Sequence, residues 1–163
     1  MFKSYVYSEF RSTYHKKPGD KENGCVFCKR LKEKDVIFST KFSFIVENEY
    51  PYNYGHMLIM PIRHVEDIRQ LTPEELSDLM NLSIQSIDLL EKVYDIKSFN
   101  LGLNQGPGSG ATVEHLHLHV VPRWLGDSGF METTASTRNI KETPEGTKER
   151  MKKAFNGKIE EYK

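Results

Sequence analysis

Cysteine and tryptophan are scarce in this 163-residue chain, which contains two cysteines and one tryptophan. Two thiols cannot build the disulfide framework of a small secreted protein. Apolar runs are also short, and none approaches the ~18 residues that a membrane span requires. The polar and aromatic residues 1–21 lack the apolar stretch of a signal peptide. We therefore expect a cytoplasmic protein with no membrane partner.

An excess of charge of either sign is missing as well. The 23 basic residues are balanced by 23 acidic ones, which gives a net charge of zero. Such a balance provides no general attraction to nucleic acids or to acidic membranes, so neither is expected as a partner. The hydrophobic fraction of 37% suits one globular domain, which at this length buries roughly two-thirds of its unfolded surface.

What the chain does have is a row of histidines. Residues 115–123 read His-Leu-His-Leu-His-Val-Val-Pro-Arg. In an extended strand, side chains alternate between faces, so three imidazoles would share one face and the aliphatic residues the other. A helix would scatter the imidazoles at about 100° per residue, and Pro122 would soon block it. Histidines tolerated on a strand or a histidine-rich metal tract are alternatives, but strict alternation favours a functional site.

The chemistry of this row points to phosphate. Imidazoles with a pKa near ~6.5 can act as nucleophile, acid or charge donor at neutral pH. The preceding loop, Gly-Pro-Gly-Ser-Gly at residues 106–110, can bring backbone N–H groups close to an anion. Because this loop lacks the Lys-Ser/Thr pair of a P-loop, we do not expect a kinase-like or ATPase site.

The clearest secondary-structure signal is a helix that starts near Thr72. Thr72 is a suitable N-cap, Pro73 suits the first helical position, and Glu75 completes a capping box. Apolar residues then recur at three- and four-residue steps, which predicts an amphipathic helix to about residue 94. The predicted apolar face comprises Leu76, Met80, Ile84, Ile87, Leu90 and Tyr94.

Strand patterns flank this helix on both sides. We expect short strands at residues 36–39, 42–46, 55–60 and 99–104, followed by the histidine stretch. Apolar residues at helical spacing between 144 and 162 predict a C-terminal helix. The order of three strands, a helix and two strands predicts an α+β domain on an antiparallel sheet.

The two cysteines form one close pair, Cys25-Val-Phe-Cys28. This spacing provides half of a tetrahedral zinc site, and His64 and His115 are candidates for the other two ligands. A redox pair is an alternative, although the βαβ context of thioredoxin is missing, and two packed thiols are another. Zinc with four protein ligands would be structural, since no coordination position stays open. No organic cofactor is expected.

These residues together resemble the histidine triad (HIT) superfamily, whose signature is three histidines alternating with apolar residues. The resemblance runs from about residue 25 to 131 and includes Gly55-His56 and Pro122-Arg123. Residues 50–53 and 122–127 are similar to the bacterial diadenosine tetraphosphate phosphorylase branch. The resemblance implies an α+β fold with a five-stranded antiparallel sheet, paired into a homodimer with a continuous sheet. We accordingly divide the chain into an arm (1–24), a HIT domain (25–131) and a tail (132–163).

The resemblance also implies a mechanism. His117 would attack the α-phosphorus of a dinucleoside polyphosphate and form a nucleotidyl-histidine intermediate, which phosphate or water releases. His119 would bind a phosphate oxygen and assist the leaving group as an acid. His115 would support and orient the site. The substrate would be a nucleotide, with an adenine dinucleotide expected.

Further residues match the nucleotide contacts and the metal ligands of the family. Asn48 matches the residue that holds the ribose, and Asn104 matches a polar contact to phosphate. Ala111 stands where many members have glutamine, which leaves the backbone contacts of the turn in place. The matched phosphate-binding turn is Gly110, Ala111, Thr112 and Val113. In zinc-containing relatives the matching ligand positions are Cys25, Cys28, His64 and His115.

Other functions share the same residues. A nucleoside phosphoramidase would use the whole triad, so only a comparison of substrates separates it from a dinucleotide-cleaving enzyme. A nucleotide-binding scaffold would keep its function after substitution of His117. A protein that binds metal through the histidine row would lose metal when His117 and His119 are removed. His56 either belongs to the site or is a satisfied structural histidine.

Overall fold

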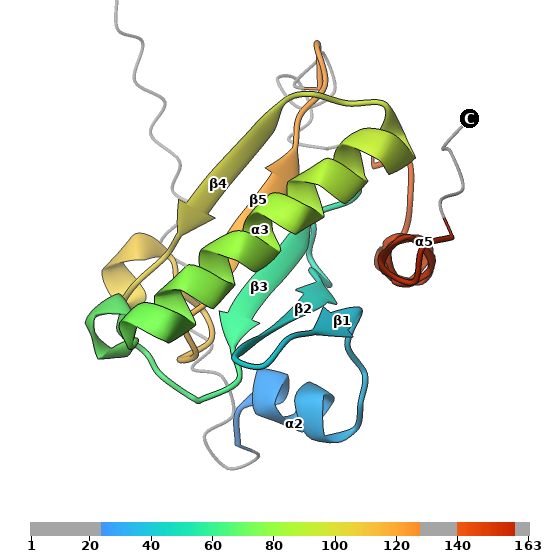
Figure 1. The fold of residues 1–163 in the computed structure, drawn as a ribbon. Coiled ribbons are helices and arrows are strands. Elements are labelled where there is room, and N and C mark those ends of the chain that lie inside the picture. The colour runs from blue at the N-terminus through green and yellow to red at the C-terminus, as the bar shows by residue number, and fades with distance from the viewer. Residues whose placement is uncertain (1–23, 128–139, 159–163) are drawn as a thin grey trace, which may run out of the picture.

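The computed structural model describes residues 24–127 and 140–158 (Figure 1). The predicted arm, apart from Gly24, and parts of the predicted tail lie outside these described residues. The elements in chain order are α2 (Val26–Lys32), β1 (Phe38–Ser39), β2 (Ser43–Glu47), β3 (Met57–Pro61), η1 (Ile68–Gln70), α3 (Pro73–Tyr94), β4 (Phe99–Leu103), η2 (Pro107–Ser109), β5 (Leu118–Pro122) and α5 (Pro144–Phe155).

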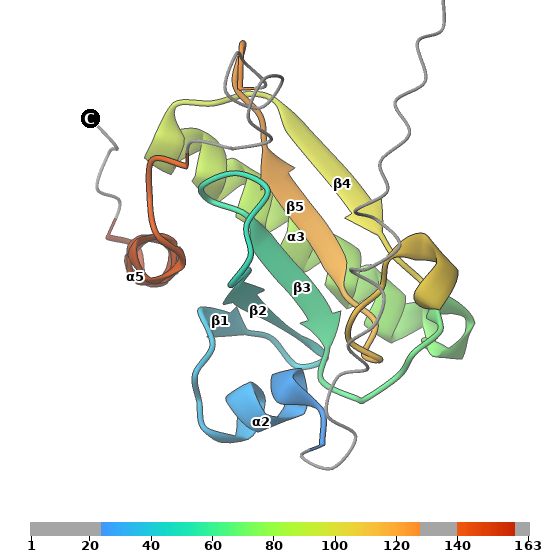
Figure 2. The same ribbon diagram turned by 180° about the vertical axis from the view of Figure 1, so that it is seen from behind.

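Five strands form one antiparallel sheet in the order β1-β2-β3-β5-β4. Figures 1 and 2 show α3 running along one face of this sheet, while α2 lies beside the β1–β2 end. The predicted α+β fold, with a five-stranded antiparallel sheet and one long helix, is confirmed. None of the helices in the described ranges is long and apolar enough to cross a membrane.

The central strands β2 and β3 are buried on both faces, so each face of the sheet has its own apolar core. The core between the sheet and α3 includes Ile45 and Ile59. The core on the α2 side includes Phe27, Phe44 and Leu58. Alternate residues of one strand therefore point into different cores, as strand periodicity requires.

Helix α3 begins as predicted, but its buried face differs from the predicted one. Thr72 and Glu75 form the capping box, with the Glu75 N–H donating to Thr72 Oγ1 at 3.2 Å. Leu90 and Tyr94 are buried, whereas Leu76, Met80 and Ile84 are exposed. The helix carries two apolar stripes, and the buried stripe contains the small Ser83 and Ser86 beside Leu79, Leu82 and Val93.

The serines explain this choice of face. Ser83 Oγ and Ser86 Oγ donate to the carbonyls of Leu79 and Leu82, each at 2.7 Å. Because each hydroxyl bonds to its own helix four residues back, both residues can be buried without an unpaired polar atom. A hydropathy pattern that counts only large apolar residues misses such a stripe.

Two other helices also depart from the predictions. Residues 26–32 form α2, a helix that the sequence pattern did not predict, in which Arg30 is buried and bonds to Glu47 at 2.6 Å. The C-terminal helix ends at Phe155, because Gly157 adopts φ +77°, a left-handed conformation that favours glycine. The remainder of the predicted helix beyond residue 158 lies outside the described residues.

Candidate active site and metal centre

The histidine row is less strand-like than predicted. Strand β5 begins only at Leu118, so His115 and His117 precede it. The chain before β5 is held instead by the 62–65 segment, because the Leu116 N–H donates to the Val65 carbonyl at 2.6 Å. This irregular backbone gives each of the three imidazoles its own surroundings.

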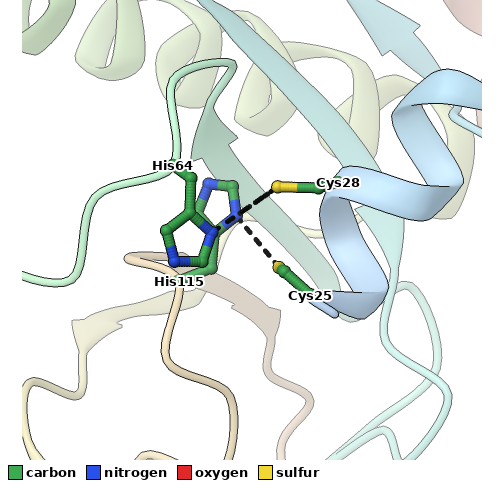
Figure 3. A group of neighbouring side chains, drawn as sticks. All are labelled: Cys25, Cys28, His64 and His115. Carbon is green, nitrogen blue, oxygen red and sulfur yellow. Dashed lines mark hydrogen bonds between the residues drawn. The ribbon is translucent and has the colours of Figure 1, made fainter. Parts of the chain in front are cut away.

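The first cluster joins Cys25, Cys28, His64 and His115. One potential ligand atom from each lies within 4.8 Å of the others (Figure 3). Nδ1 of His115 is 3.3 Å from Cys25 Sγ and 3.6 Å from Cys28 Sγ, and Nδ1 of His64 is 3.5 Å from Cys28 Sγ. Cys25 is the N-cap of α2 and Cys28 lies in its first turn, and the imidazoles come from segments after β3 and before β5. The structure thus brings all four predicted metal ligands together.

The chemistry of this donor set fits a tetrahedral metal. Nε2 of His115 lies 2.9 Å from the Pro61 carbonyl, so the ring N–H donates there and leaves the Nδ1 lone pair facing the thiols. Ligands about 2.0–2.3 Å from a central zinc would stand roughly 3.3–3.8 Å from each other, close to the distances found. Burial raises the pKa of the Cys28 thiol to about 11, and a bound metal ion would stabilise the thiolate instead.

His117 lies at the centre of the row and is buried. Its Nδ1 is 2.7 Å from the His115 carbonyl oxygen, which can only accept. The Nδ1–H therefore donates to that carbonyl, and Nε2 keeps its lone pair. Burial lowers the pKa of His117, opposed by this hydrogen bond, and the neutral imidazole is favoured. A neutral ring with an available Nε2 has the form of a nucleophile.

His119, the next histidine, faces a different set of groups. Its ring lies 5.0 Å from the His117 ring, centroid to centroid, and its Nδ1 is 3.0 Å from Nε2 of His56. The other nitrogen, Nε2, is buried, and it has no hydrogen-bond partner within the part of the chain that the structure describes. Burial lowers the pKa of His119 to about 4. An unpaired buried polar atom beside a nucleophile is typical of a position that a ligand completes.

His56 belongs to the site. It is 1% exposed and precedes β3 at the end of the 48–56 loop. Its imidazole contacts His119, and burial together with the neighbouring histidines lowers the pKa of His56 to about 3. The ring of Tyr52 lies over the pair, 4.9 Å from the His56 ring and 5.8 Å from the His119 ring.

The predicted nucleotide-contacting residues are spread around these imidazoles. Asn48 lies next to His56, and its amide nitrogen is 3.2 Å from Nδ1 of that ring. Asn104 directly follows β4, where Leu103 pairs with Leu118. The turn formed by Gly110, Ala111, Thr112 and Val113 follows η2.

Two aromatic contacts of the site escape sequence reasoning. Phe27, between the two cysteines, packs edge-on against His117 at 5.3 Å and His115 at 6.0 Å. The position of Phe27 between the two cysteines indicates that one side chain can contact both the metal cluster and the triad. Tyr52 sits in a loop rich in proline and asparagine, and no periodicity of that loop indicates which way its ring turns.

The fold and this constellation define a histidine triad protein. The HIT domain family matches residues 29–124, more than half of the chain, and the chain belongs to that family. A zinc-bound histidine triad family protein from Mycobacterium smegmatis superposes with a TM-score of 0.67 over 82% of this chain and 94% of that one, at 24% identity. At that identity the likeness shows the shared fold.

Two curated relatives are closer in sequence. An AP-4-A phosphorylase from Mycobacterium tuberculosis is 39% identical over 106 residues, which cover 64% of this chain and 54% of the relative. An asymmetrical bis(5'-nucleosyl)-tetraphosphatase from Schizosaccharomyces pombe is 37% identical over 92 residues, which cover 56% and 50%. The chain thus spans about half the length of the curated relatives it matches.

Proposed function

We propose that this protein is an enzyme that cleaves dinucleoside polyphosphates of the diadenosine tetraphosphate type at the α-phosphate, through a nucleotidyl-His117 intermediate. The observation that carries the proposal is the hydrogen bond from His117 Nδ1–H to the His115 carbonyl at 2.7 Å, which leaves Nε2 unprotonated. The nearby Nε2 of His119, which has no partner among the described residues, supports a hydrogen-bond donor at the leaving group.

The reaction then has two displacement steps. In the first, the Nε2 lone pair of His117 forms a bond to the α-phosphorus, and the bond from that phosphorus to the polyphosphate oxygen breaks. The departing oxygen leaves as a polyphosphate anion that accepts a hydrogen bond from Nε2–H of His119, and His119 stays neutral. In the second, an oxygen of inorganic phosphate or water bonds to the α-phosphorus as the bond from His117 Nε2 to that phosphorus breaks, and the proton of an attacking water leaves to solvent. The names of the two relatives, one a phosphorylase and one a tetraphosphatase, support both acceptors.

The remaining site residues are assigned to binding within a domain of residues 25–131. Asn104 and the turn of Gly110, Ala111, Thr112 and Val113 would contact the phosphate chain. Gly106 and Gly110 have φ of +80° and +89°, and glycine permits such a tight turn close to an anion. Asn48 would approach the ribose from the opposite loop.

The cluster of Cys25, Cys28, His64 and His115 is proposed to bind one structural zinc ion. Its two sulfurs and two nitrogens lie within 4.8 Å of one another, with three sulfur–nitrogen pairs at 3.3–3.6 Å, which supports this assignment. Zinc would supply a rigid cross-link between α2 and the segments that follow β3 and precede β5. The bound ion would fix the side chain of His115. The backbone carbonyl of His115 would then stay oriented toward Nδ1 of His117.

A homodimer is proposed through β4 and α3. β4 is an edge strand with Leu101 exposed, and α3 exposes Leu76, Met80 and Ile84 at four-residue steps. An apolar ridge beside an unpaired strand edge is suited to a second copy that extends the sheet. Light scattering should give twice the chain mass, and Met80→Glu with Ile84→Glu should give the monomer mass. A wild-type monomer would refute this assembly.

The function is tested by product analysis with diadenosine tetraphosphate, with and without inorganic phosphate. ADP and ATP formed only with phosphate would establish a phosphorylase. AMP and ATP formed regardless of phosphate would establish a hydrolase. Absence of turnover under both conditions would overturn the proposal, and turnover of an adenosine phosphoramidate in the same assay would then assign the triad to P–N cleavage.

A further inference from the structure

We propose that His56 is a positioning residue that sets the tautomer and orientation of His119, so that His119 presents an Nε2–H to the leaving group. This inference rests on the proposed function only for the identity of the leaving group. The arrangement of protons follows from hydrogen bonds that the loop of residues 48–56 makes with itself and with β5.

The first step is the orientation of the Asn48 side chain. Its Oδ1 accepts a hydrogen bond from the backbone N–H of Tyr50 at 3.0 Å. An amide carbonyl can only accept, so this bond distinguishes the oxygen of Asn48 from its nitrogen. The NH₂ group must therefore be the end that lies 3.2 Å from Nδ1 of His56.

The second step concerns the backbone donor that meets Nδ1 of His56. The Asn48 amide nitrogen lies 3.2 Å from Nδ1 and 3.4 Å from Nε2 of that ring and so does not choose between them, whereas the backbone N–H of Tyr52 donates to Nδ1 at 3.0 Å. A nitrogen that accepts hydrogen bonds carries no proton, so the proton of neutral His56 is on Nε2. The lowered pKa of His56, about 3 because of burial, agrees with a neutral ring.

The third step carries this assignment to His119. Nε2–H of His56 lies 3.0 Å from Nδ1 of His119 and donates to it. Because Nδ1 of His119 accepts, the proton of this second ring is on Nε2. That atom is buried and has no hydrogen-bond partner among the described residues. Each ring nitrogen of His56 and His119 thus has one assigned role. The last of them, Nε2 of His119, is a donor.

The loop of residues 48–56, where this series of hydrogen bonds begins, is held in place by two further hydrogen bonds. The Asn53 amide donates to Asp127 at 3.0 Å, and the Gly55 N–H donates to Thr147 Oγ1 on α5 at 3.1 Å. Gly55 itself has φ +73°, which disfavours any other residue, and an added Cβ would stand only 3.1–3.3 Å from Pro122, Tyr94 and Leu90. A loop fixed in this way keeps His56 in place while substrate enters and products leave.

Glutamine and asparagine at position 56 provide a matched pair. The amide nitrogen of glutamine lies about as far along the side chain as imidazole Nε2, so His56→Gln keeps a donor for His119. Asparagine reaches only to the level of Nδ1, so His56→Asn keeps the contact with the loop and loses that donor. We expect kcat for diadenosine tetraphosphate to fall about tenfold in His56→Asn, a typical effect of removing an orienting hydrogen bond. His56→Gln should stay within about threefold of wild type, and KM should change little in both.

The direct readout is ¹⁵N NMR of the histidine-labelled wild-type protein at neutral pH, which needs neither a variant nor turnover. Protonated Nε2 on both His56 and His119, with a scalar coupling between His56 Nε2 and His119 Nδ1, is expected. In His56→Asn the His119 resonances should show loss of the hydrogen-bonded Nδ1, and in His56→Gln they should keep it.

A proton on Nδ1 of either wild-type ring, or absence of the coupling, would overturn the inference. So would a loss of kcat in His56→Gln as large as in His56→Asn at equal melting temperature. These outcomes are separate from the proposed function, because the NMR assignment is made without substrate. Wild-type protein that shows the assigned tautomers but no cleavage would refute the function alone.

Discussion

Two histidines of one row, His115 and His119, belong to two different sites. His115 turns Nδ1 toward two thiols and has its Nε2 occupied by a backbone carbonyl. His119 has its Nδ1 occupied by His56 and leaves Nε2 for a ligand. Both residues are histidines, and the partner of one ring nitrogen determines the role of the other. His115 is left to bind a metal, and His119 is left to act on the leaving group. A motif of three histidines therefore does not describe one site.

His117 connects these two regions. Its Nδ1–H is held by the carbonyl of His115, and its ring lies beside that of His119. Phe27 fills the space against both His115 and His117. The metal cluster can thus position His117 through the backbone of His115, while the 48–56 loop positions His119. The following changes separate these contributions.

The largest effect is expected from His117→Ala. Loss of the nucleophile should lower kcat at least about 10⁴-fold, as for other covalent catalytic residues. Nucleotide affinity, measured by calorimetry with a non-cleavable analogue, should change only a few-fold. Turnover within tenfold of wild type would rule out a nucleotidyl-His117 intermediate.

Cys25→Ser should act on the metal cluster and only indirectly on His119. Wild-type protein should contain about one zinc per chain by elemental analysis, and the variant far less. Unfolding free energy should fall by several kcal/mol, because metal binding stabilises the folded state directly. His119→Gln is the matched control, since it should keep full zinc content. Equal metal loss in both variants would mean that the histidine row itself binds the metal.

His119→Ala should affect the leaving group, because it removes the Nε2–H that the departing oxygen accepts. We expect kcat for diadenosine tetraphosphate to fall about 10²-fold, the lower range for loss of one donor to developing negative charge. His119→Gln, whose amide nitrogen reaches about as far as imidazole Nε2, should lose far less. An equal loss in both variants would contradict the role of His119 as a donor to the leaving group.

The smallest effect is a change in the pH dependence of stability. The pKa of His56 is about 3 in the folded protein, below the usual ~6.5 of an unfolded chain. The contribution of neutral His56 to the free energy of unfolding is complete above pH 6.5. That free energy falls by up to about 1.4 kcal/mol per pH unit as the pH drops from 6.5 toward 3. Between pH 6.5 and 5, wild type should therefore lose about 2 kcal/mol more than His56→Gln in urea unfolding. Parallel losses would show that His56 is not neutral in the folded state.

Patterns with strong local chemistry were predictable from the sequence. The capping box at Thr72 and Glu75 depends only on neighbouring residues. The alternation of histidines and the Cys-x-x-Cys spacing identified the two clusters, and His64 and His115 were candidates for the remaining ligands, in agreement with the family resemblance. The structure brings these four ligands together as expected.

The rest depends on contacts between distant segments. The buried face of α3 is decided by Ser83 and Ser86, whose hydroxyls are satisfied by the helix itself. The start of β5 is delayed because Val65 takes the hydrogen bond of Leu116. The role of His56 depends on which nitrogen the Tyr52 backbone reaches, and no spacing in the sequence contains that information.

The most direct test of the account is rapid-quench mass spectrometry during turnover of diadenosine tetraphosphate. Peptide mapping of the quenched wild-type protein should find one adenylyl group, on the peptide that contains His117, and fragmentation should place it on that residue. The group should be absent in His117→Ala and should disappear from wild type once substrate is exhausted. Turnover without a covalent adenylyl group, or an adenylyl group on His119, would contradict the division of the histidine row described above.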